Sequence, residues 1–364
     1  MVVKLTAKIK LLPDKKQADF LKQTILIYNK ACNHISEKAW ADKIFGQYNL
    51  QKLLYKTIKE TFSLTAQIII QCIVKVVDAY KLDKKAQRRF KPLGAITYDS
   101  RILSWKTDKQ IVSIWSVEGR LKIPYICGER QKELLRFQQG ETDLVLIDRQ
   151  FYLHTTCNIE IPTPEDFKDI IGIDRGIKNI ATLSTGDNFA SNHLLSIRCR
   201  YRNIRKKLQK KGTVSAKRLL KKRNKKETRF ATHTNHVISK AIVAKAKDTK
   251  SSLALEDLKG IRERTTVRKE QRATHYSWGF HQLAKFIEYK DLLAGVPIFY
   301  ADPRNTSREC ISCGHIDKAN RKSQSLFSCK NCGYTANADL NAAMVIANRG
   351  RTVVNQSYAT SFMA

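Results

Sequence analysis

The sequence predicts an α+β protein of more than one domain, in which a small β-barrel interrupted by helices precedes an α/β region that carries a zinc ribbon. Three observations lead to this prediction. The chain has 364 residues, of which 42% are hydrophobic, and single hydrophobic cores stop growing near about 250–300 residues. The spacing of apolar residues changes several times along the chain, which separates strands from helices. Two Cys-x-x-Cys pairs stand near the C-terminus.

The N-terminal part predicts one strand followed by a helical unit. Apolar and polar residues alternate over residues 3–10, and Pro13 ends this strand. Apolar residues then recur every three or four positions through Ala18–Ala39, Leu50–Phe62 and Ile69–Tyr80, which predicts three helices with one apolar face each. The large aromatic residues of this unit are expected to pack in its core rather than to stack on bases: Tyr28, Trp40 and Tyr80.

Between about residues 95 and 161 the period of the apolar residues becomes two. Short alternating runs separated by turn residues are typical of a small antiparallel barrel. The runs are 111–115, 121–123, 144–147 and 151–153. The strand at 3–10 can complete this barrel, with the helical unit inserted between its first and second strands.

Strand and helix patterns alternate in the remainder of the chain. Two strands at 170–173 and 180–183 precede a long basic helical region at 194–249. The pattern continues with a strand at 253–256, a helix around Trp278–Leu293, a strand at 297–300 and a last helix from Ala338 to Asn348. Gly350 is expected to stop that helix, and residues 351–364 are expected to form a loose tail.

The charge balance indicates a polyanionic partner. Lys and Arg number 67 against 33 Asp and Glu, so the formal net charge is 67 − 33 = +34, which favours nucleic acid as that partner. No apolar run approaches the ~20 residues of a membrane-spanning helix, and the N-terminus lacks the apolar segment of a signal peptide. We therefore expect an intracellular protein with no membrane partner and with its nine cysteines reduced or metal-bound.

The basic helical region is the strongest candidate for phosphate contact. Between Arg198 and Arg229 the chain carries sixteen Lys or Arg residues and a single acid, Glu227. A solvated helix face normally carries charges of both signs. Charges of one sign alone repel one another unless phosphates neutralise them. The candidate nucleic-acid-binding residues are Arg205, Lys206, Lys207, Lys221, Lys222 and Arg223 in this region, and Arg88 and Arg89 at the basic exit of the helical unit.

The two cysteine pairs predict a structural zinc site. Cys310 and Cys313 are separated by 15 residues from Cys329 and Cys332, which is the spacing of a four-thiolate zinc ribbon. Four incidental thiols are the alternative, and this spacing disfavours it. His315 follows the first pair and is expected to be a turn residue rather than a further ligand. Since the protein fills all four positions, the zinc ion would be structural.

Three acids at the ends of apolar segments predict a second metal site. Asp174 ends the strand at 170–173, Glu256 ends the strand at 253–256, and Asp339 lies in the first turn of the last helix. Buried carboxylates require a partner or a metal, and a carboxylate cluster suits magnesium. Two such ions can support phosphodiester cleavage. Each acid alone could be a helix cap or a neutraliser of nearby cations, so the prediction depends on all three together. The chain has no P-loop and no recognisable Ser or Cys nucleophile motif.

Together these segments resemble the TnpB family, which comprises transposon-encoded, RNA-guided nucleases related to type V CRISPR effectors. The resemblance is strong over residues 170–350, where first acid, basic helices, second acid, ribbon and third acid follow in the family's order. In the N-terminal half it is carried by Leu12–Gln17 and by Tyr28-Asn29. The C-terminal motifs are Gly172–Asn179, Leu253–Leu258, Asp302–Ser307 and Asn337–Asn341.

The resemblance implies a domain organisation. Residues 1–12 and 93–168 would form a wedge-type β-barrel, and residues 13–92 an inserted helical recognition lobe. Residues 169–350 would form a RuvC-like, RNase H-type nuclease domain, within which 194–249 is a basic helical hairpin and 308–336 the zinc ribbon.

The resemblance also implies an activity: magnesium-dependent, RNA-guided cleavage of DNA with Asp174, Glu256 and Asp339 as the catalytic, metal-binding acids. The partners would be a guide RNA derived from the transposon end and a double-stranded DNA target read beside a short adjacent motif. The resemblance further implies a location in the cytoplasm of a prokaryotic cell, with activity at the nucleoid. Three alternatives stay open: a nuclease-inactive RNA-guided repressor, a DNA-joining transposase, and a basic scaffold without catalysis.

Overall fold

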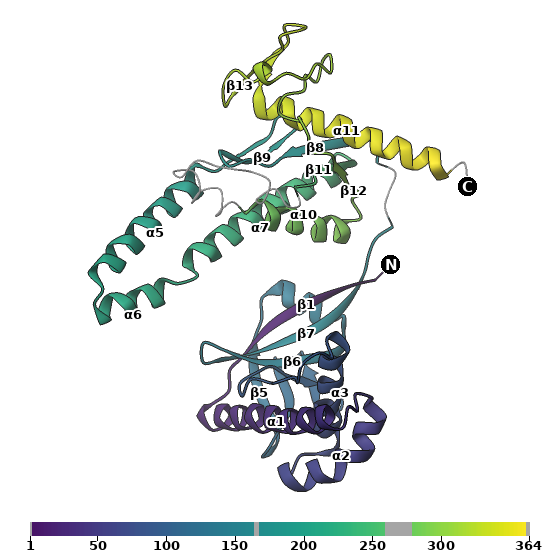
Figure 1. Ribbon diagram of the computed structural model, residues 1–364, viewed down its shortest axis with the longest axis vertical. Coiled ribbons are helices and arrows are strands. Elements are labelled where there is room, and N and C mark those ends of the chain that lie inside the picture. Colours follow the sequence, from purple (N-terminus) through teal and green to yellow (C-terminus); the bar gives the residue numbers. More distant parts are fainter. Residues whose placement is uncertain (1, 164–166, 259–278, 362–364) are drawn as a thin grey trace. The chain divides into compact units, whose positions relative to one another are not determined.

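The chain divides into two compact units, residues 1–160 and 161–364, both drawn in Figure 1. The computed structural model describes residues 2–163, 167–258 and 279–361. Each unit combines helices with a β-sheet of its own, so the mixed α/β character predicted from the sequence is confirmed.

The first unit contains a seven-stranded antiparallel sheet that is nearly closed. In spatial order its strands are β2 (Ile96–Tyr98), β6 (Gln138–Ile147), β7 (Gln150–Glu160), β1 (Val2–Leu11), β5 (Gly119–Ile126), β4 (Ile111–Ser116) and β3 (Leu103–Lys106). The strand predicted at 3–10 is β1, and it pairs with β7 on one side and with β5 on the other. A short helix, α4 (Glu129–Leu135), connects β5 to β6. The phenol of Tyr98 in β2 donates a hydrogen bond of 3.1 Å to the main-chain oxygen of Trp115 in β4, which links the strand at one end of the sheet to the strand next to the other end.

Three helices lie between β1 and β2 in the chain, as predicted. They are α1 (Lys15–Ala41), α2 (Gln47–Phe62) and α3 (Ala66–Leu82), and their apolar faces share one continuous core with the sheet. Asp14 begins α1 with a capping box that includes Gln17. Tyr28 and Tyr80 are fully buried in this core, which confirms their expected packing role. Trp40 is half-buried and stacks on Tyr80.

The second unit is built on a mixed five-stranded sheet. Its order is β10 (Asn188–Ala190), β9 (Asn179–Leu183), β8 (Asp169–Asp174), β11 (Ser251–Glu256) and β12 (Ile298–Ala301). The first three strands are antiparallel neighbours, whereas β8, β11 and β12 run parallel. Helix α11 (Ala338–Ser361) lies along one face of this sheet, and α7 (Lys226–Asp248) and α10 (Phe280–Ala294) cover the other (Figure 1).

Alternation along the central strands decides which side chains meet which helix. Ile171 and Ile173 of β8, with Leu253 of β11, pack in the core that also contains α7 and α10. Ile170 and Ala254, of the opposite parity, pack with α11. Because side chains alternate between faces with a period of two, Asp174 and Glu256 belong to the α11 face.

The expectation that Gly350 ends the last helix is wrong. Helix α11 continues through Gly350 to Ser361. A Cβ atom at Gly350 would lie 2.8 Å from the Cβ of Ala254, and one at Gly172 would lie 2.0 Å from the main-chain oxygen of Ala343. Glycine is therefore required at both positions because helix and sheet approach closely, and not because the helix stops.

The basic helical region forms three helices rather than a simple hairpin. They are α5 (Asn192–Lys211), α6 (Val214–Arg223) and α7; in Figure 1, α6 lies at the end of the insertion between α5 and α7. Gly212 has a φ of +66° and ends α5, while the Thr213 side chain caps α6. Lys225, also at +66°, precedes α7.

The predicted helix near residue 280 is α10, which begins at Phe280; Trp278 lies outside the described residues. Among the helices in the described ranges, none combines the length and the apolar character needed to cross a membrane.

Candidate active site

The three predicted acids come together at one end of the five-stranded sheet. Asp174 is the last residue of β8 and Glu256 the last residue of β11. The parallel register pairs Ile173 with Leu255, so the same register carried one residue further sets the two acids side by side. Both belong to the face covered by α11, whose first turn contains Asp339.

The segment Asn337–Asn341 fixes the start of α11. The side-chain oxygen of Asn337 accepts hydrogen bonds from the main-chain nitrogens of Asp339 (3.0 Å) and Leu340 (3.2 Å), which satisfies donors that a helix start leaves free. Asn341 is fully buried; its amide donates to the main-chain oxygen of Glu309 and accepts from the nitrogen of Ile311. The segment Asn337–Asn341 therefore caps α11, carries the acid Asp339 and connects the first cysteine turn to this helix.

Neighbouring polar groups orient the carboxylates. Asp339 accepts a hydrogen bond from the amide of Asn179 (2.8 Å) and forms an ion pair with Arg321 (3.1 Å). The hydroxyl of Thr306 donates to Glu256 at 2.5 Å, and the buried guanidinium of Arg175 donates to the main-chain oxygen of Glu256. These four residues were not assigned roles from the sequence. Asn179, Arg175 and Thr306 lie inside the family motifs, whereas Arg321 carries no sequence signal.

Burial destabilises the anionic forms of two of the acids, and repulsion by neighbouring carboxylates adds to this effect at Asp174. Burial, followed by the charges of Glu256 and Asp339, raises the pKa of Asp174 to about 7. Burial also raises the pKa of Glu256, against the opposing effects of Thr306, Arg175 and Arg349. Acids that repel each other across a shared space are a recognised mark of a functional site.

The carboxylates offer hard oxygen ligands, which fits divalent magnesium. They do not converge as tightly as the ligands of a single ion. In the described part of the chain, the cysteines form the only group of three or more His, Cys, Asp or Glu ligands whose ligand atoms all lie within 4.8 Å of one another. The ion pair with Arg321 and the bond from Asn179 hold Asp339. A pair of ions ~3.5–4 Å apart distributes its ligands over a longer span than one ion does.

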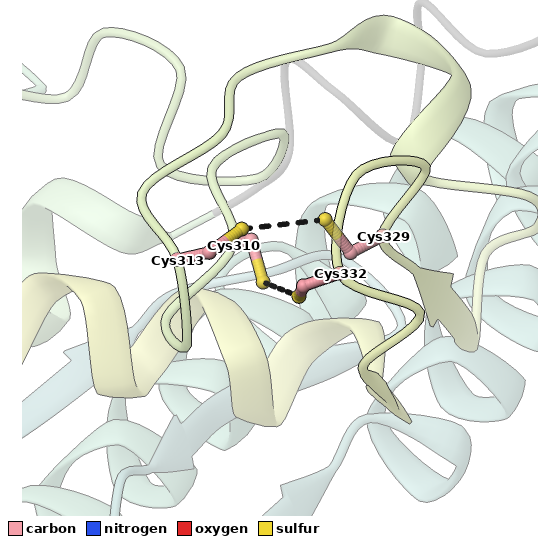
Figure 2. A group of neighbouring side chains, drawn as sticks. All are labelled: Cys310, Cys313, Cys329 and Cys332. Atoms are coloured by element: carbon pink, nitrogen blue, oxygen red, sulfur yellow. Dashed lines mark hydrogen bonds between the residues drawn. The ribbon is translucent and has the colours of Figure 1, made fainter.

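The four predicted zinc ligands meet above the start of α11, as Figure 2 shows. The sulfurs of Cys310 and Cys332 are 3.7 Å apart, and those of Cys313 and Cys329 are 3.6 Å apart. A tetrahedron with Zn–S bonds of about 2.3 Å has edges of about 3.8 Å, so the thiols match a four-coordinate zinc site. The backbone amide of His315 lowers the pKa of the Cys313 thiol to about 6, which favours the thiolate that binds metal.

The two cysteine turns have the same backbone construction. The nitrogen of Gly314 donates to the oxygen of Cys310, and that of Gly333 to the oxygen of Cys329. Both glycines have positive φ angles, 74° and 73°, a conformation that other residues adopt at a cost. Strands β13 (Leu326–Ser328) and β14 (Thr335–Asn337) pair beside them and lead into α11.

The candidate nucleic-acid-binding residues differ in their availability. Lys206, Lys207, Lys221 and Lys222 are exposed on α5 and α6. Arg205 is exposed but forms an ion pair with Glu227 at 2.8 Å, and Arg223 is half-buried over Tyr201. In the first unit, Arg89 is exposed, whereas the guanidinium of Arg88 is occupied by the carboxylate and main-chain oxygen of Asp83.

Comparison with known proteins identifies the family. A family described as "Probable transposase" matches residues 152–262, and a "Cas12f1-like, TNB domain" matches residues 280–346. A TnpB-like protein of Methanocaldococcus jannaschii is 30% identical over 207 residues, which cover 53% of this chain and 73% of that protein. The chain belongs to the TnpB family.

Other relatives of this TnpB-family chain are CRISPR-associated endodeoxyribonucleases. Cas12f1 of Sulfoacidibacillus thermotolerans is 26% identical over 352 residues, covering 84% of this chain and 82% of that protein. Cas12f2 of a Micrarchaeota archaeon is 30% identical over 219 residues, which cover 55% of this chain but 40% of that protein.

A solved structure has a similar fold. The Cas12f1 chain in a Cas12f1–sgRNA–target DNA complex superimposes with a TM-score of 0.58 and 16% sequence identity, covering 91% of the TnpB-family chain and 82% of that chain. At this identity the likeness concerns the fold alone.

Proposed function

We propose that this TnpB-family protein is an RNA-guided DNA endonuclease encoded by an insertion-sequence transposon. The observation that carries the proposal is the convergence of Asp174, Glu256 and Asp339 at one end of the sheet, where burial and then repulsion by the other two acids raise the pKa of Asp174 to about 7. Relatives named as endodeoxyribonucleases support the same activity. The acids would be the catalytic ligands of two magnesium ions in a RuvC-like, RNase H-type nuclease domain.

Bound magnesium would supply an activated water and charge stabilisation for the leaving oxygen of the phosphodiester. The chain's own part is to hold three carboxylates in fixed positions. Thr306 directs one oxygen of Glu256, and Asn179 and Arg321 each direct one oxygen of Asp339. Asp174 is the last residue of β8, the central strand of the sheet, and regular elements hold functional side chains more precisely than loops do.

The four cysteines would hold a structural zinc ion. Because Asn341 joins the first cysteine turn to α11, zinc binding would stabilise the helix start that carries Asp339.

The proposed domain assignment follows from the resemblance to the TnpB family. Residues 1–12 and 93–168 would serve as the wedge and 13–92 as the recognition lobe, and 169–350 would cleave.

The proposed partners are a guide RNA from the transposon's own end and double-stranded DNA with a short adjacent motif. Guide pairing would select the target, while the protein reads that motif and the shape of the duplex. The excess of cations on α5 and α6 supports a polyanion there. Sequencing the RNA that copurifies with the protein would supply the guide needed to design a cleavage substrate.

Two alternative activities use the same fold. A nuclease-inactive RNA-guided repressor would not need the acids, and the presence of all three favours cleavage over this alternative. A DNA-joining transposase could use the same two-metal site, so it must be separated by experiment: products rejoined to a second DNA, rather than free ends, would favour it.

The decisive variant is Asp174→Ala. We expect it to abolish magnesium-dependent cleavage of a guide-matched DNA and to leave RNA binding nearly intact, because the cations that would bind RNA lie on other elements. Asp248→Ala is a matched control, since this acid is exposed at the end of α7, and it should cleave like the unmodified protein. Full cleavage by Asp174→Ala would refute the assignment.

A further inference from the structure

A hollow in the basic insertion is lined by none of the three acids and none of the four cysteines. It measures about 420 Å³ and is lined by residues of α5, α6 and the start of α7. This volume is in the range of pockets that hold small molecular groups. Its apolar floor is formed by Ile204, Leu208 and Leu220.

An aromatic ring and an arginine stand together at this hollow. The guanidinium carbon of Arg223 lies 5.3 Å from the centre of the Tyr201 ring, within the range of a cation–π contact. The Nε atom of Arg223 is buried and has no hydrogen-bond partner in the described part of the chain. Lys221 and Lys225 add two cations to the rim, which also contains the ion pair of Arg205 and Glu227.

This combination limits the chemistry of the occupant. Half-exposed leucine and isoleucine side chains lie here among sixteen cations. A flat apolar group that covers these side chains would remove their surface from water, and an anion would neutralise the cations of the rim. An unstacked nucleotide supplies both, because its base can stack on an aromatic side chain and its phosphates can meet lysine and arginine. A base inside a duplex is already stacked and paired, so it could not enter.

We propose that the hollow binds one unpaired base of the guide RNA. The base would enter beside Tyr201 over the apolar floor, and the adjoining phosphates would lie against Lys221 and Lys225. The inference rests on the proposed function in that it takes RNA as the partner, and it adds a single-nucleotide site within that RNA.

The test compares two probes of equal phosphate number. One is a fluorescein-labelled 12-nucleotide oligouridylate, and the other is the same RNA chain without bases. Full-length protein, freed of nucleic acid by high salt, should bind the oligouridylate about 5- to 100-fold more tightly than the abasic chain, as expected for one stacked base. Tyr201→Ala should remove most of that ratio and leave the affinity for the abasic chain unchanged.

Further variants separate stacking from charge and from folding. Tyr201→Phe should retain the preference for bases, and Tyr201→Leu should lose it while keeping an apolar side chain at that position. Lys222→Ala, which removes a cation outside the hollow, should weaken both probes by the same factor. Leu219→Ala, at an exposed neighbour of the floor, should change neither affinity.

The proposal is overturned if the unmodified protein binds both probes equally, if Tyr201→Ala weakens both equally, or if duplex RNA competes as well as the single strand. DNA oligothymidylate that binds as tightly as the RNA would reassign the site to displaced DNA and overturn the guide-RNA assignment. None of these measurements uses cleavage. If the unmodified protein shows no preference for bases but still cuts guide-matched DNA, the base-binding role of the hollow is refuted and the nuclease assignment is not.

Discussion

Replacing Asp174 by asparagine should stabilise the magnesium-free protein. In the folded chain the pKa of Asp174 rises from 3.8 to about 7, so the carboxyl keeps its proton between about pH 4 and pH 7 while the unfolded chain has lost it. Stability therefore falls as the pH rises through this window. At about 1.36 kcal/mol for each step in pKa, a rise of about 3 sets an upper limit of about 4 kcal/mol.

Asparagine is neutral at every pH and avoids this penalty. We expect Asp174→Asn to exceed the unmodified protein in stability at pH 8 by about 2 kcal/mol and to match it near pH 4. For a unit of this size the gain corresponds to about 4–8 °C in Tm, measured by scanning calorimetry in magnesium-free buffer. Burial also raises the pKa values of Glu256 and Asp291, and both acids therefore lower the stability of both proteins as the pH rises. The difference in stability between the two proteins then reports on Asp174.

Two further results would test the cause. Magnesium should raise the Tm of the unmodified protein more than that of the variant, because a ligand stabilises the state that binds it. Asp248→Asn, at an exposed position, should leave the Tm unchanged at both pH values. Equal Tm values for Asp174→Asn and the unmodified protein at pH 8 would refute the electrostatic reasoning.

Three other changes address the ribbon, the basic insertion and the helix packing. Cys329→Ala should lower zinc content and Tm together, and unchanged zinc by elemental analysis would defeat the ribbon assignment. Replacing Lys221, Lys222 and Arg223 by glutamine should weaken RNA binding and reduce the slope of log affinity against log salt concentration by up to about 2–3. An unaltered slope would show that these residues face solvent and do not contact phosphates. Gly350→Leu should destabilise the second unit by about 1–3 kcal/mol or more, measured by denaturant unfolding, because α11 would have to move away from Ala254; wild-type stability would show that the helix can shift freely.

The sequence predicted the elements of the fold better than their contacts. Strand β1 and helices α1–α3 follow from local periodicity, which the chain carries within each segment. The end of α11 could not be obtained in this way. A glycine one residue beyond an apolar stretch is a usual stop signal, and only the position of Ala254 opposite Gly350 shows that this glycine serves packing.

The candidate site shows the same division. The acids were recognisable because each ends an apolar segment, and alternation along β8 and β11 then explains why Asp174 and Glu256 share a face. Arg321 was not recognisable, because it lies in a loop between the two cysteine pairs and reaches Asp339 only through the fold. A long-range ion pair of one loop residue leaves no periodic pattern in the sequence.

The cysteine site and Asp339 are connected by direct contacts. Arg321 lies between the two cysteine pairs and contacts Asp339, while the amide of Asn341, two residues after that acid, attaches the first cysteine turn. Asp339 is thus held from both sides by the segment that carries the four thiols. If the proposed catalytic role holds, Asp339 must keep its position within a fraction of an ångström, and zinc binding at the cysteine turns would then help to place this acid.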